Sequence, residues 1–378
     1  MKGLFSWPRF VAVLVKEFIQ MRRDRLTFAM MVGIPMIQLV LFGFAINTDP
    51  KHLPTALVMG DQSAFSRSVL AALSNSGYFE LVRVAESERE AERLLAEGEV
   101  QFVVNIPEGF ARKVVRGERP ALLIEADATD PAATSNAIAA LTAVGQTVLT
   151  RDLGGALSGL QSGPAPFDVR IHRRYNPEGV TQYNIVPGLM GVILTMTMIM
   201  MTALAMTRER ERGTMESLLA TPVRPLEVMI GKIIPYILVG YIQVTLILLV
   251  SRFVFGVPMQ GSLILLLGCV LIFMLANLSV GMLFSTIAKN QMQAMQMTFF
   301  FFLPSILLSG FMFPFRGMPH WAQHVGDILP LTHLLRIVRG ILLKGNGMME
   351  VLPHLGPLLL FMLVVILIGL KRYRRTLD

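Results

Sequence analysis

Residues 181–206, TQYNIVPGLMGVILTMTMIMMTALAM, contain no charged side chain, and the run TRERER follows directly. A helix needs about 20 mainly apolar residues to cross a bilayer core. This stretch is long enough, and the charges that follow it are typical of a helix leaving the membrane. It therefore predicts a transmembrane helix and an integral membrane protein.

The composition of the whole chain agrees with this interpretation. The 378 residues are 53% hydrophobic and 16% charged, with a mean hydropathy of +0.57 and a net charge of +8. Soluble domains carry about 25% charged residues, and disordered chains are far less apolar. Cys269 is the only cysteine, so an intrachain disulfide scaffold is excluded.

Six apolar segments are long enough to be transmembrane helices. An outer-membrane barrel would show short alternating segments instead. The predicted fold class is therefore an α-helical integral membrane protein with six transmembrane helices. The predicted spans are 27–46, 181–206, 228–250, 262–287, 292–313 and 353–370.

Residues 1–26 precede the first span, residues 27–46, and are basic. Their apolar positions repeat at helical spacing, which is typical of an amphipathic helix lying in the membrane interface. The alternative is a basic leader without a role of its own. The apolar face comprises Val11, Leu14, Val15 and Phe18, and the polar face comprises Arg9, Lys16, Gln20 and Arg23.

The Lys and Arg residues beside the spans predict the orientation. With the N-terminus inside, the cytoplasmic flanks hold 15 of these residues and the short outer loops hold four. The positive-inside rule then places both termini in the cytoplasm, including the tail, residues 372–378. The net charge of +8 is thus mainly an orientation signal, and nucleic acid is not expected as a partner.

Residues 47–179 separate the first two spans and are predicted to be an extracytoplasmic α/β domain. They carry 13 basic and 17 acidic residues. Short runs rich in Val and Leu predict strands, and helical patterns lie between them. The predicted strands are 55–59, 78–84, 100–106, 121–126 and 167–175, and the predicted helices are 63–73, 87–97, 107–116 and 131–153.

Phosphate-binding signatures are absent from the sequence. No strand-to-helix turn in the α/β domain carries a Gly-rich fingerprint, and no G-x-x-x-x-G-K-[ST] loop occurs anywhere. The chain is therefore not expected to hydrolyse ATP by itself or to bind a cofactor.

Amides and hydroxyls, rather than ionisable groups, occupy the centres of the spans. This pattern disfavours an ion-coupled carrier. Such groups join helices by hydrogen bonds more often than they bind substrate, and both roles stay open. The candidate residues are Gln38, Thr195, Thr197, Gln243, Asn277 and Ser305.

A weak metal-ligand pattern occurs at His320 and His324, followed by Asp327. On a helix these side chains share one face, as metal ligands do. The favoured interpretation is a polar interfacial helix after Pro319, so no metal is predicted.

The stretch after the second span presents alternating charges from Arg208 to Arg212. Gly213 suits a helix end, and residues 214–220 suit a short helix that Pro222 would stop. A short helix held by charged ends is a surface on which a partner protein could push. The alternative is a solvated turn whose charges compensate each other.

The same stretch, RERERGTMESLLATPVRPLEVMIGK at 208–232, resembles the signature of ABC-2 type transporter permeases. The similarity is to the bacterial multidrug-export branch, which has a large extracytoplasmic domain after the first span. Two further stretches agree: NIPEGFARKVVRGERPAL at 105–122 and GMPHWAQHVGDILPLTHLLRIVRGILLKG at 317–345.

The resemblance implies an architecture in which residues 180–371 form the main transmembrane domain. Residues 207–226 would form the cytoplasmic coupling loop, and residues 314–350 would re-enter the outer leaflet as short helices. Residues 1–26 would be a connecting helix. The residues that would couple to an ATPase are Arg208, Glu209, Arg210, Glu211, Arg212, Gly213, Thr214, Glu216, Ser217, Leu218, Thr221 and Pro222.

The resemblance also implies the partners. Separate ABC ATPase subunits would bind ATP and Mg²⁺, and the permease would pair with a second copy or a paralogue. A periplasmic adaptor is a further expected partner of the outer domain.

The resulting prediction is the permease subunit of an ATP-driven exporter in the bacterial inner membrane. Its substrate would be hydrophobic or amphiphilic. The alternative is a membrane receptor or scaffold whose outer domain binds a ligand without transport.

Overall fold

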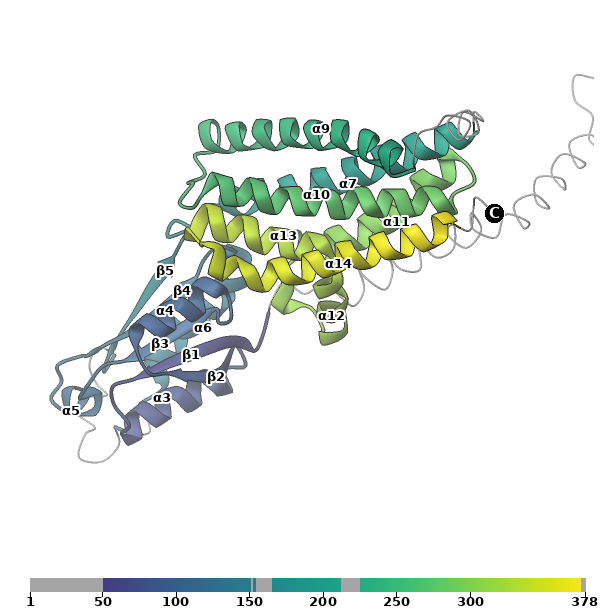
Figure 1. Ribbon diagram of the computed structural model, residues 1–378. Coiled ribbons are helices and arrows are strands. Elements are labelled where there is room, and N and C mark those ends of the chain that lie inside the picture. Colours follow the sequence, from purple (N-terminus) through teal and green to yellow (C-terminus); the bar gives the residue numbers. More distant parts are fainter. Residues whose placement is uncertain (1–49, 151, 154–164, 212–224, 375–378) are drawn as a thin grey trace, which may run out of the picture.

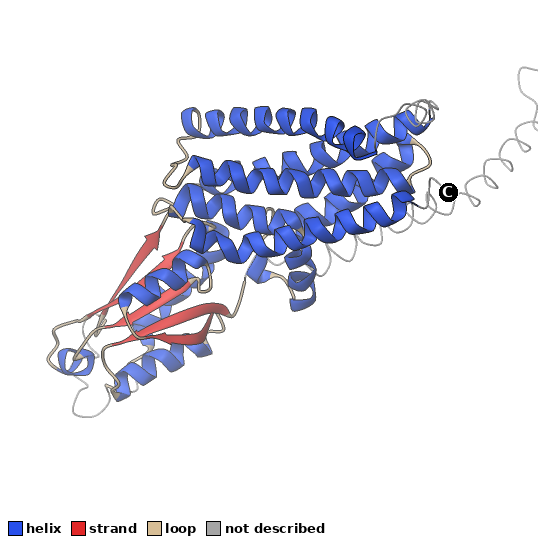
Figure 2. Cartoon of the chain, viewed as in Figure 1, coloured by secondary structure: helices blue, strands red, loops and turns tan. Residues whose placement is uncertain are grey.

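The computed structural model describes residues 50–150, 152–153, 165–211 and 225–374 (Figure 1). A small α/β domain lies at one end of a bundle of long helices (Figure 2). The predicted N-terminal helix, the predicted span 27–46 and the predicted helix 214–220 fall outside the described residues.

The α/β domain contains a five-stranded sheet with the order β2-β1-β3-β4-β5. The neighbours pair in parallel, except that β3 and β4 are antiparallel. The strands are β1 (Leu53–Met59), β2 (Phe79–Ala85), β3 (Phe102–Ile106), β4 (Ala121–Asp127) and β5 (Asp168–Arg174).

Helices cover both faces of this sheet. On one face, α3 (Ala64–Asn75), α5 (Phe110–Val115) and α6 (Pro131–Thr147) pack their apolar side chains on the strands. On the other face, α4 (Glu88–Glu97) contributes a smaller cluster with Val103. The central strands β1, β3 and β4 are mostly buried because both faces are covered, whereas the edge strands β2 and β5 are more exposed.

The elements of this domain lie close to their predicted positions, with two corrections. The helix predicted at 107–116 begins only at Phe110, because Gly109 precedes it with a left-handed backbone (φ +66°). The helix predicted at 131–153 ends at Thr147. Ser87 is the N-cap of α4: the Glu90 N–H donates to Ser87 Oγ at 3.2 Å.

Four helices in the described part of the chain are long and apolar enough to cross a membrane. They are α7 (Thr181–Glu211), α9 (Pro225–Phe253), α10 (Leu263–Ile287) and α14 (Met348–Arg374). The apolar core of the bundle draws on all four, and α10 contacts α7, α9 and α14. Four of the six predicted spans therefore correspond to helices of sufficient length.

The fifth predicted span, 292–313, is a shorter helix in the structure. The helix α11 (Gln291–Leu308) has 18 residues and is not among the four candidates. Glutamines at 291, 293 and 296 make its first turns polar, and Gly310 follows its end with φ +83°. The predicted end at residue 313 was thus too late.

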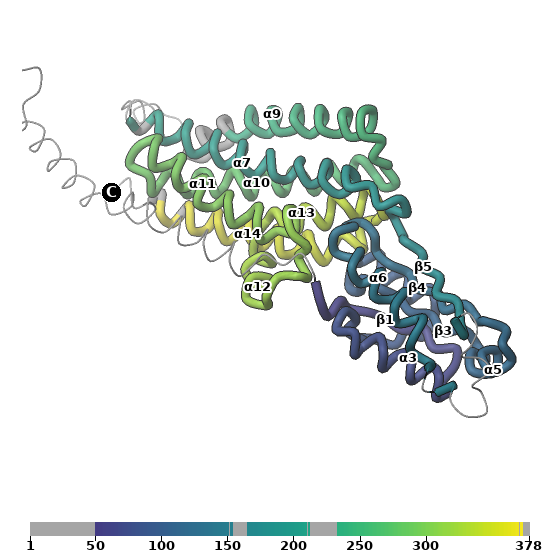
Figure 3. The backbone as a smooth tube through the Cα atoms, turned by 180° about the vertical axis from the view of Figure 1, so that it is seen from behind, coloured from purple at the N-terminus to yellow at the C-terminus, as the bar shows by residue number. Residues whose placement is uncertain are grey.

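Short helical segments connect α11 to α14. They are η3 (Phe315–Gly317), α12 (His320–Ile328), α13 (Pro330–Arg339) and the π-helical turn η4 (Gly340–Lys344). Figure 3 shows α12 projecting beside the bundle. By contrast, α13 contributes buried residues, including Leu331, Leu334 and Leu335, to the bundle core.

Candidate functional site

The end of α7 that lies away from the sheet contacts the first residue of α11 (Figure 1). The backbone N–H of Gln291 donates to Glu211 Oε1 at 2.8 Å, and its side-chain Nε2 donates to Glu211 Oε2 at 2.5 Å. Arg208 Nε donates to Gln291 Oε1 at 3.3 Å. The side-chain and backbone donors of Gln291 lower the pKa of Glu211. The run of alternating charges at the end of α7 is therefore hydrogen-bonded to α11.

Most of the remaining residues of the predicted coupling loop lie outside the described part of the chain. Glu209 and the backbone of Arg210 belong to α7. The others lie outside the described residues: Arg212, Gly213, Thr214, Glu216, Ser217, Leu218, Thr221 and Pro222. Gln291 is not among the coupling residues predicted from the sequence, although its place directly after the N-cap Asn290 is a helix-start signal.

Four of the polar residues predicted inside the spans bond to their own helices, including Thr197, which donates to the Ile193 carbonyl at 2.8 Å. The side chains of Thr195, Asn277 and Ser305 are buried and donate to the carbonyls of residues 191, 273 and 301 at 2.7, 2.9 and 2.7 Å. Back-bonding of this kind satisfies a hydroxyl within one helix, whereas Asn277 Oδ1 is buried and has no hydrogen-bond partner among the described residues. These contacts favour a packing role, and a substrate-pathway role stays a prediction.

The structure brings together one pair of the predicted polar residues. Thr197 Oγ1 on α7 lies 3.0 Å from Gln243 Oε1 on α9. This contact joins two neighbouring helices of the bundle, as polar groups in membranes commonly do. Gln38 lies outside the described residues.

The predicted metal-ligand pattern on α12 does not converge. His320 and His324 are exposed, while the Asp327 carboxylate accepts from Arg336 NH2 at 3.1 Å. No group of three or more His, Cys, Asp or Glu side chains within the described ranges has metal-ligand geometry.

The α/β domain meets the bundle at η4. Lys344 Nζ donates to Asp127 Oδ2 at 2.6 Å and to the carbonyl oxygen of Leu95 at 3.0 Å. Asn346 Nδ2 donates to the carbonyl oxygen of Ala96 at 3.1 Å. These donors meet the C-terminal carbonyls of α4, where a positive charge is favourable.

The same junction holds Tyr175, which follows β5. Lys344 Nζ lies 5.1 Å from the centre of its ring. Burial and the Asp127 carboxylate raise the pKa of Tyr175 to about 12. The phenol therefore remains neutral beside this ion pair.

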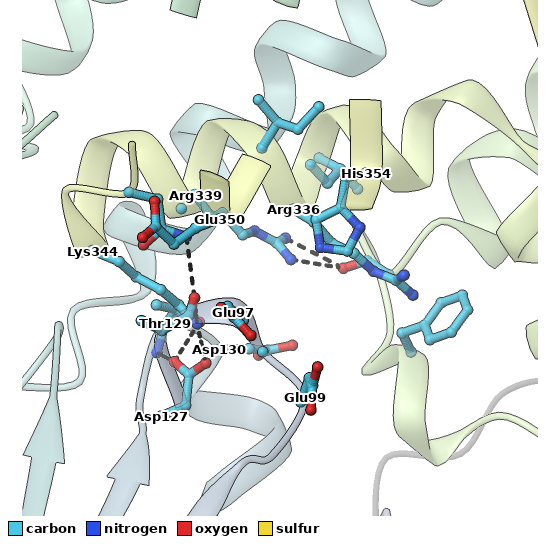
Figure 4. Close-up of a pocket in the computed structure, with 18 of the residues that line it drawn as sticks. Glu97, Glu99, Asp127, Thr129, Asp130, Arg336, Arg339, Lys344, Glu350 and His354 are labelled. Atoms are coloured by element: carbon cyan, nitrogen blue, oxygen red, sulfur yellow. Dashed lines mark hydrogen bonds and ion pairs between the residues drawn. The ribbon is translucent and has the colours of Figure 1, made fainter. Parts of the chain in front are cut away.

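A pocket of about 340 Å³ opens beside this junction. Figure 4 shows Arg336, Arg339 and Lys344 on the side of the bundle, with Glu97, Glu99 and Asp130 on the side of the α/β domain. Both terminal nitrogens of Arg339 donate to the carbonyl oxygen of Gly310 at 3.2 Å.

The sequence does not predict this junction. Lys344 is one of the four basic residues in the short outer loops, and nothing beside it distinguishes it from a solvated charge. Its partner, Asp127, is 217 residues away.

Known proteins provide an independent comparison. The profile of the ABC-2 family of transporter proteins matches residues 25–371. The probable multidrug ABC transporter permease YbhS of Escherichia coli is 31% identical over 382 residues, covering 99% of each chain.

Two further Escherichia coli proteins are similar over most of their length. The probable multidrug ABC transporter permease YbhR is 28% identical over 351 residues, covering 93% of this chain and 94% of its own. The inner membrane transport permease YhhJ is 29% identical over 363 residues, covering 91% and 93%. The profile and YbhS each match nearly the whole chain, which therefore belongs to the ABC-2 family of transporter proteins, as a permease.

Proposed function

We propose that this permease is the membrane subunit of an exporter driven by separate ATPase subunits. The main support is the family match over residues 25–371, together with relatives named as multidrug permeases. The sequence contains no phosphate-binding loop, so ATP and Mg²⁺ would bind to the partner. The substrate would be a hydrophobic or amphiphilic molecule from the cytosol or the inner leaflet.

The proposed coupling element is the segment 207–226, which begins in the last turn of α7 and ends in the first turn of α9. ATP-dependent movement of the partner would displace this loop and, through it, α7 and α11. The bonds of Glu211 and Arg208 to Gln291 support this route. The permease would contribute different substrate affinities in two states, and ATP binding would change their populations.

The proposed topology has six spans in a bacterial inner membrane. Both termini lie in the cytoplasm, and residues 47–179 lie on the outer side of the membrane. It includes the span 27–46 and α11 in addition to the four long helices. Residues 314–350 would re-enter the outer leaflet. A second copy or a paralogue would complete the pathway, and a periplasmic adaptor would contact the α/β domain.

Labelling with a membrane-impermeant maleimide tests the topology. The only native cysteine, Cys269, is buried, so it provides a low background. In right-side-out vesicles, Glu118→Cys in the α/β domain is expected to label, whereas Glu216→Cys in the loop is expected to label only after permeabilisation. Labelling of both positions from outside would contradict the proposed orientation.

Purification and transport measurements test the function. An ATPase is expected to copurify with the full chain, and Glu216→Arg is expected to abolish transport of a fluorescent amphiphile. Glu118→Arg, the same charge reversal on an exposed residue of the α/β domain, is the matched control. No copurifying ATPase, together with unchanged transport in Glu216→Arg, would favour a receptor or scaffold.

A further inference from the structure

The pocket beside η4 has two walls of opposite charge. The wall formed by the bundle carries mainly basic side chains, and the wall formed by the α/β domain carries acidic ones (Figure 4). The one acidic residue on the bundle wall is Glu350, whose carboxylate accepts from the Gly347 N–H at 2.8 Å. The basic residues of the bundle wall are Arg316, Arg336, Arg339 and Lys344, and the acidic residues of the α/β domain are Glu97, Glu99, Asp127 and Asp130.

Within the described part of the chain, one ion pair joins the two walls directly, between Lys344 and Asp127. Other charges are paired within their own wall. Arg336 bonds to Asp327 on α12, whereas Glu97 and Glu99 lie 3.8 and 3.5 Å from arginines of the α/β domain. Arg316, Arg339 and Asp130 form no ion pair among the described residues, although Arg339 and Asp130 influence each other's charge across the pocket. Their contacts leave room for a molecule placed between the walls.

On the basic wall, two arginines have unused donors. Arg339 Nε is shielded from solvent and has no acceptor among the described residues. Burial lowers the pKa of Arg339, which indicates that its charge is incompletely compensated. Arg316 is exposed and has no hydrogen bond or ion pair in the described ranges. An anionic group at this wall would supply the missing acceptors.

On the acidic wall, Asp130 is the N-cap of α6. Its Oδ1 accepts from the Ala132 N–H and from Asn184 Nδ2, both at 3.2 Å. Burial raises the pKa of this carboxyl. A cationic group here would stabilise its charged form.

From these two walls we propose that the pocket is a binding site for a zwitterion that carries a phosphate and an ammonium group. The phosphate lies against Arg316 and Arg339, and the ammonium lies against Asp130. An anion alone would face the acidic wall, and a cation alone would face the basic wall. The volume of about 340 Å³ lies in the ~300–1,000 Å³ range of small-ligand sites.

Two sources could supply this chemistry. The pocket includes Ser309 after α11 and Glu350 at the start of α14, and helix ends lie at the depth of lipid headgroups. A phosphatidylethanolamine headgroup can therefore reach it from the membrane, and free phosphoethanolamine can reach it from the aqueous phase. The site requires no ATP turnover and goes beyond the proposed transport function.

The test uses the delipidated full chain in detergent, with phosphatidylethanolamine and phosphatidylglycerol of equal chain length as probes. Native mass spectrometry measures the lipid that is retained. We expect phosphatidylethanolamine to be retained about tenfold better, which is the scale of one charged hydrogen bond. Equal retention of the two lipids would overturn the proposal.

Variants separate the two walls. Asp130→Asn keeps a good N-cap and is expected to remove the preference for phosphatidylethanolamine, whereas Arg316→Gln is expected to weaken both lipids. Arg112→Gln, on the exposed surface of α5, is the matched control. If Asp130→Asn melts early without lipid, Asp130→Ser, which also keeps a good N-cap, replaces it. An unchanged preference in the acidic-wall variant would contradict the site.

Competition with free phosphoethanolamine distinguishes the sources. Displacement of the lipid supports a site that the headgroup alone fills. Retention of the lipid supports a site that also needs the glycerol and chains, next to apolar lining such as Leu335 and Val351.

Discussion

Lys344 Nζ lies 2.6 Å from Asp127 Oδ2, and both side chains are less than a tenth exposed, at 8% and 9%. This ion pair joins the bundle to the α/β domain. A backbone hydrogen bond also joins two segments of the bundle here. The Gln260 N–H donates to the carbonyl oxygen of Leu342 at 3.0 Å, so the loop between α9 and α10 is bonded to η4 as well. Movement of the α/β domain would therefore displace η4 and the loop between α9 and α10.

Removing one partner of this pair should be costly. Lys344→Met leaves the Asp127 carboxylate buried without its cation, and the expected destabilisation is ~3–5 kcal/mol. Thermal unfolding of the purified protein measures the loss. The control is Arg170→Met, because Arg170 is 70% exposed beside Asp168 and such surface pairs contribute only ~0–1 kcal/mol.

A double variant separates charge burial from lost packing. Asp127→Asn keeps an oxygen for the Thr129 N–H and hydroxyl, and combined with Lys344→Met it removes both charges. Most of the lost stability should return in the double variant. If it is as unstable as Lys344→Met alone, packing rather than the unpaired charge is responsible.

Gly281 on α10 marks a close approach to α7. A Cβ atom there would lie 2.5 Å from the carbonyl oxygen of Ile199 and 2.9 Å from Thr202 Cβ. Small residues allow such approaches between membrane helices, so Gly281→Ala should cost ~1–3 kcal/mol through overpacking. Thermal unfolding in detergent measures this cost.

Gly268 provides the comparison on the same helix. A Cβ atom at this position would meet nothing within 4 Å, so Gly268→Ala should be neutral or stabilising by up to ~1 kcal/mol. Equal destabilisation by both variants would show that the close approach of α7 and α10 does not limit stability.

The elements of the α/β domain were predictable because local signals decide them. Apolar runs of strand length, the N-caps Ser63 and Ser87, and Pro131 at a helix start all act within a few residues. The left-handed backbone at Gly109 was missed because Pro107 and Glu108 also suit a first helical turn. Because Gly109 takes this left-handed backbone, α5 begins at Phe110 and not at Pro107.

The junction was not predictable, because its contacts join distant parts of the chain. A lysine in an outer loop looks the same whether it is solvated or pairs with a carboxylate 217 residues away. The polar residues inside the spans pose the same difficulty. Thr195 and Thr197 are two residues apart and both bond within α7, yet only Thr197 also meets Gln243.

The Asp61 carboxylate should make the α/β domain sensitive to acid. It accepts from the Ser63 N–H at 2.8 Å, the Ser66 hydroxyl at 2.9 Å and the Ala111 N–H at 3.2 Å. Slight burial opposes ionisation, but these hydrogen bonds outweigh it and lower the pKa of Asp61 from 3.8 to about 2. Its contribution to stability is therefore present above the unfolded-state pKa of 3.8 and is lost as the pH falls towards 2.

Thermal unfolding at pH 6 and pH 3 tests this expectation. Asp61→Asn should be less stable than the unmodified chain at pH 6 and should lose less stability between pH 6 and pH 3. Glu108→Gln changes an exposed carboxyl nearby and serves as the control. A parallel loss in Asp61→Asn and the unmodified chain would assign the acid sensitivity to other groups.

The contact between Glu211 and Gln291 should carry movement from the coupling loop to α11. Gln291 is the first residue of α11, and three hydrogen bonds join it to α7. Its backbone and side-chain N–H groups donate to Glu211, and its side-chain oxygen accepts from Arg208. Gln291→Glu would place a second carboxylate against Glu211 and break this connection. Under the proposed function, the amount of substrate transported per ATP hydrolysed should fall several-fold, about the effect of 1 kcal/mol of coupling, while the ATPase remains bound.

Two further variants are the controls for this prediction. Exchanging the pair, as Glu211→Gln with Gln291→Glu, should restore part of the transport ratio. Lys289→Gln, on the exposed surface nearby, should leave the ratio unchanged. An unaltered transport ratio in Gln291→Glu would mean that α11 receives the movement through another contact.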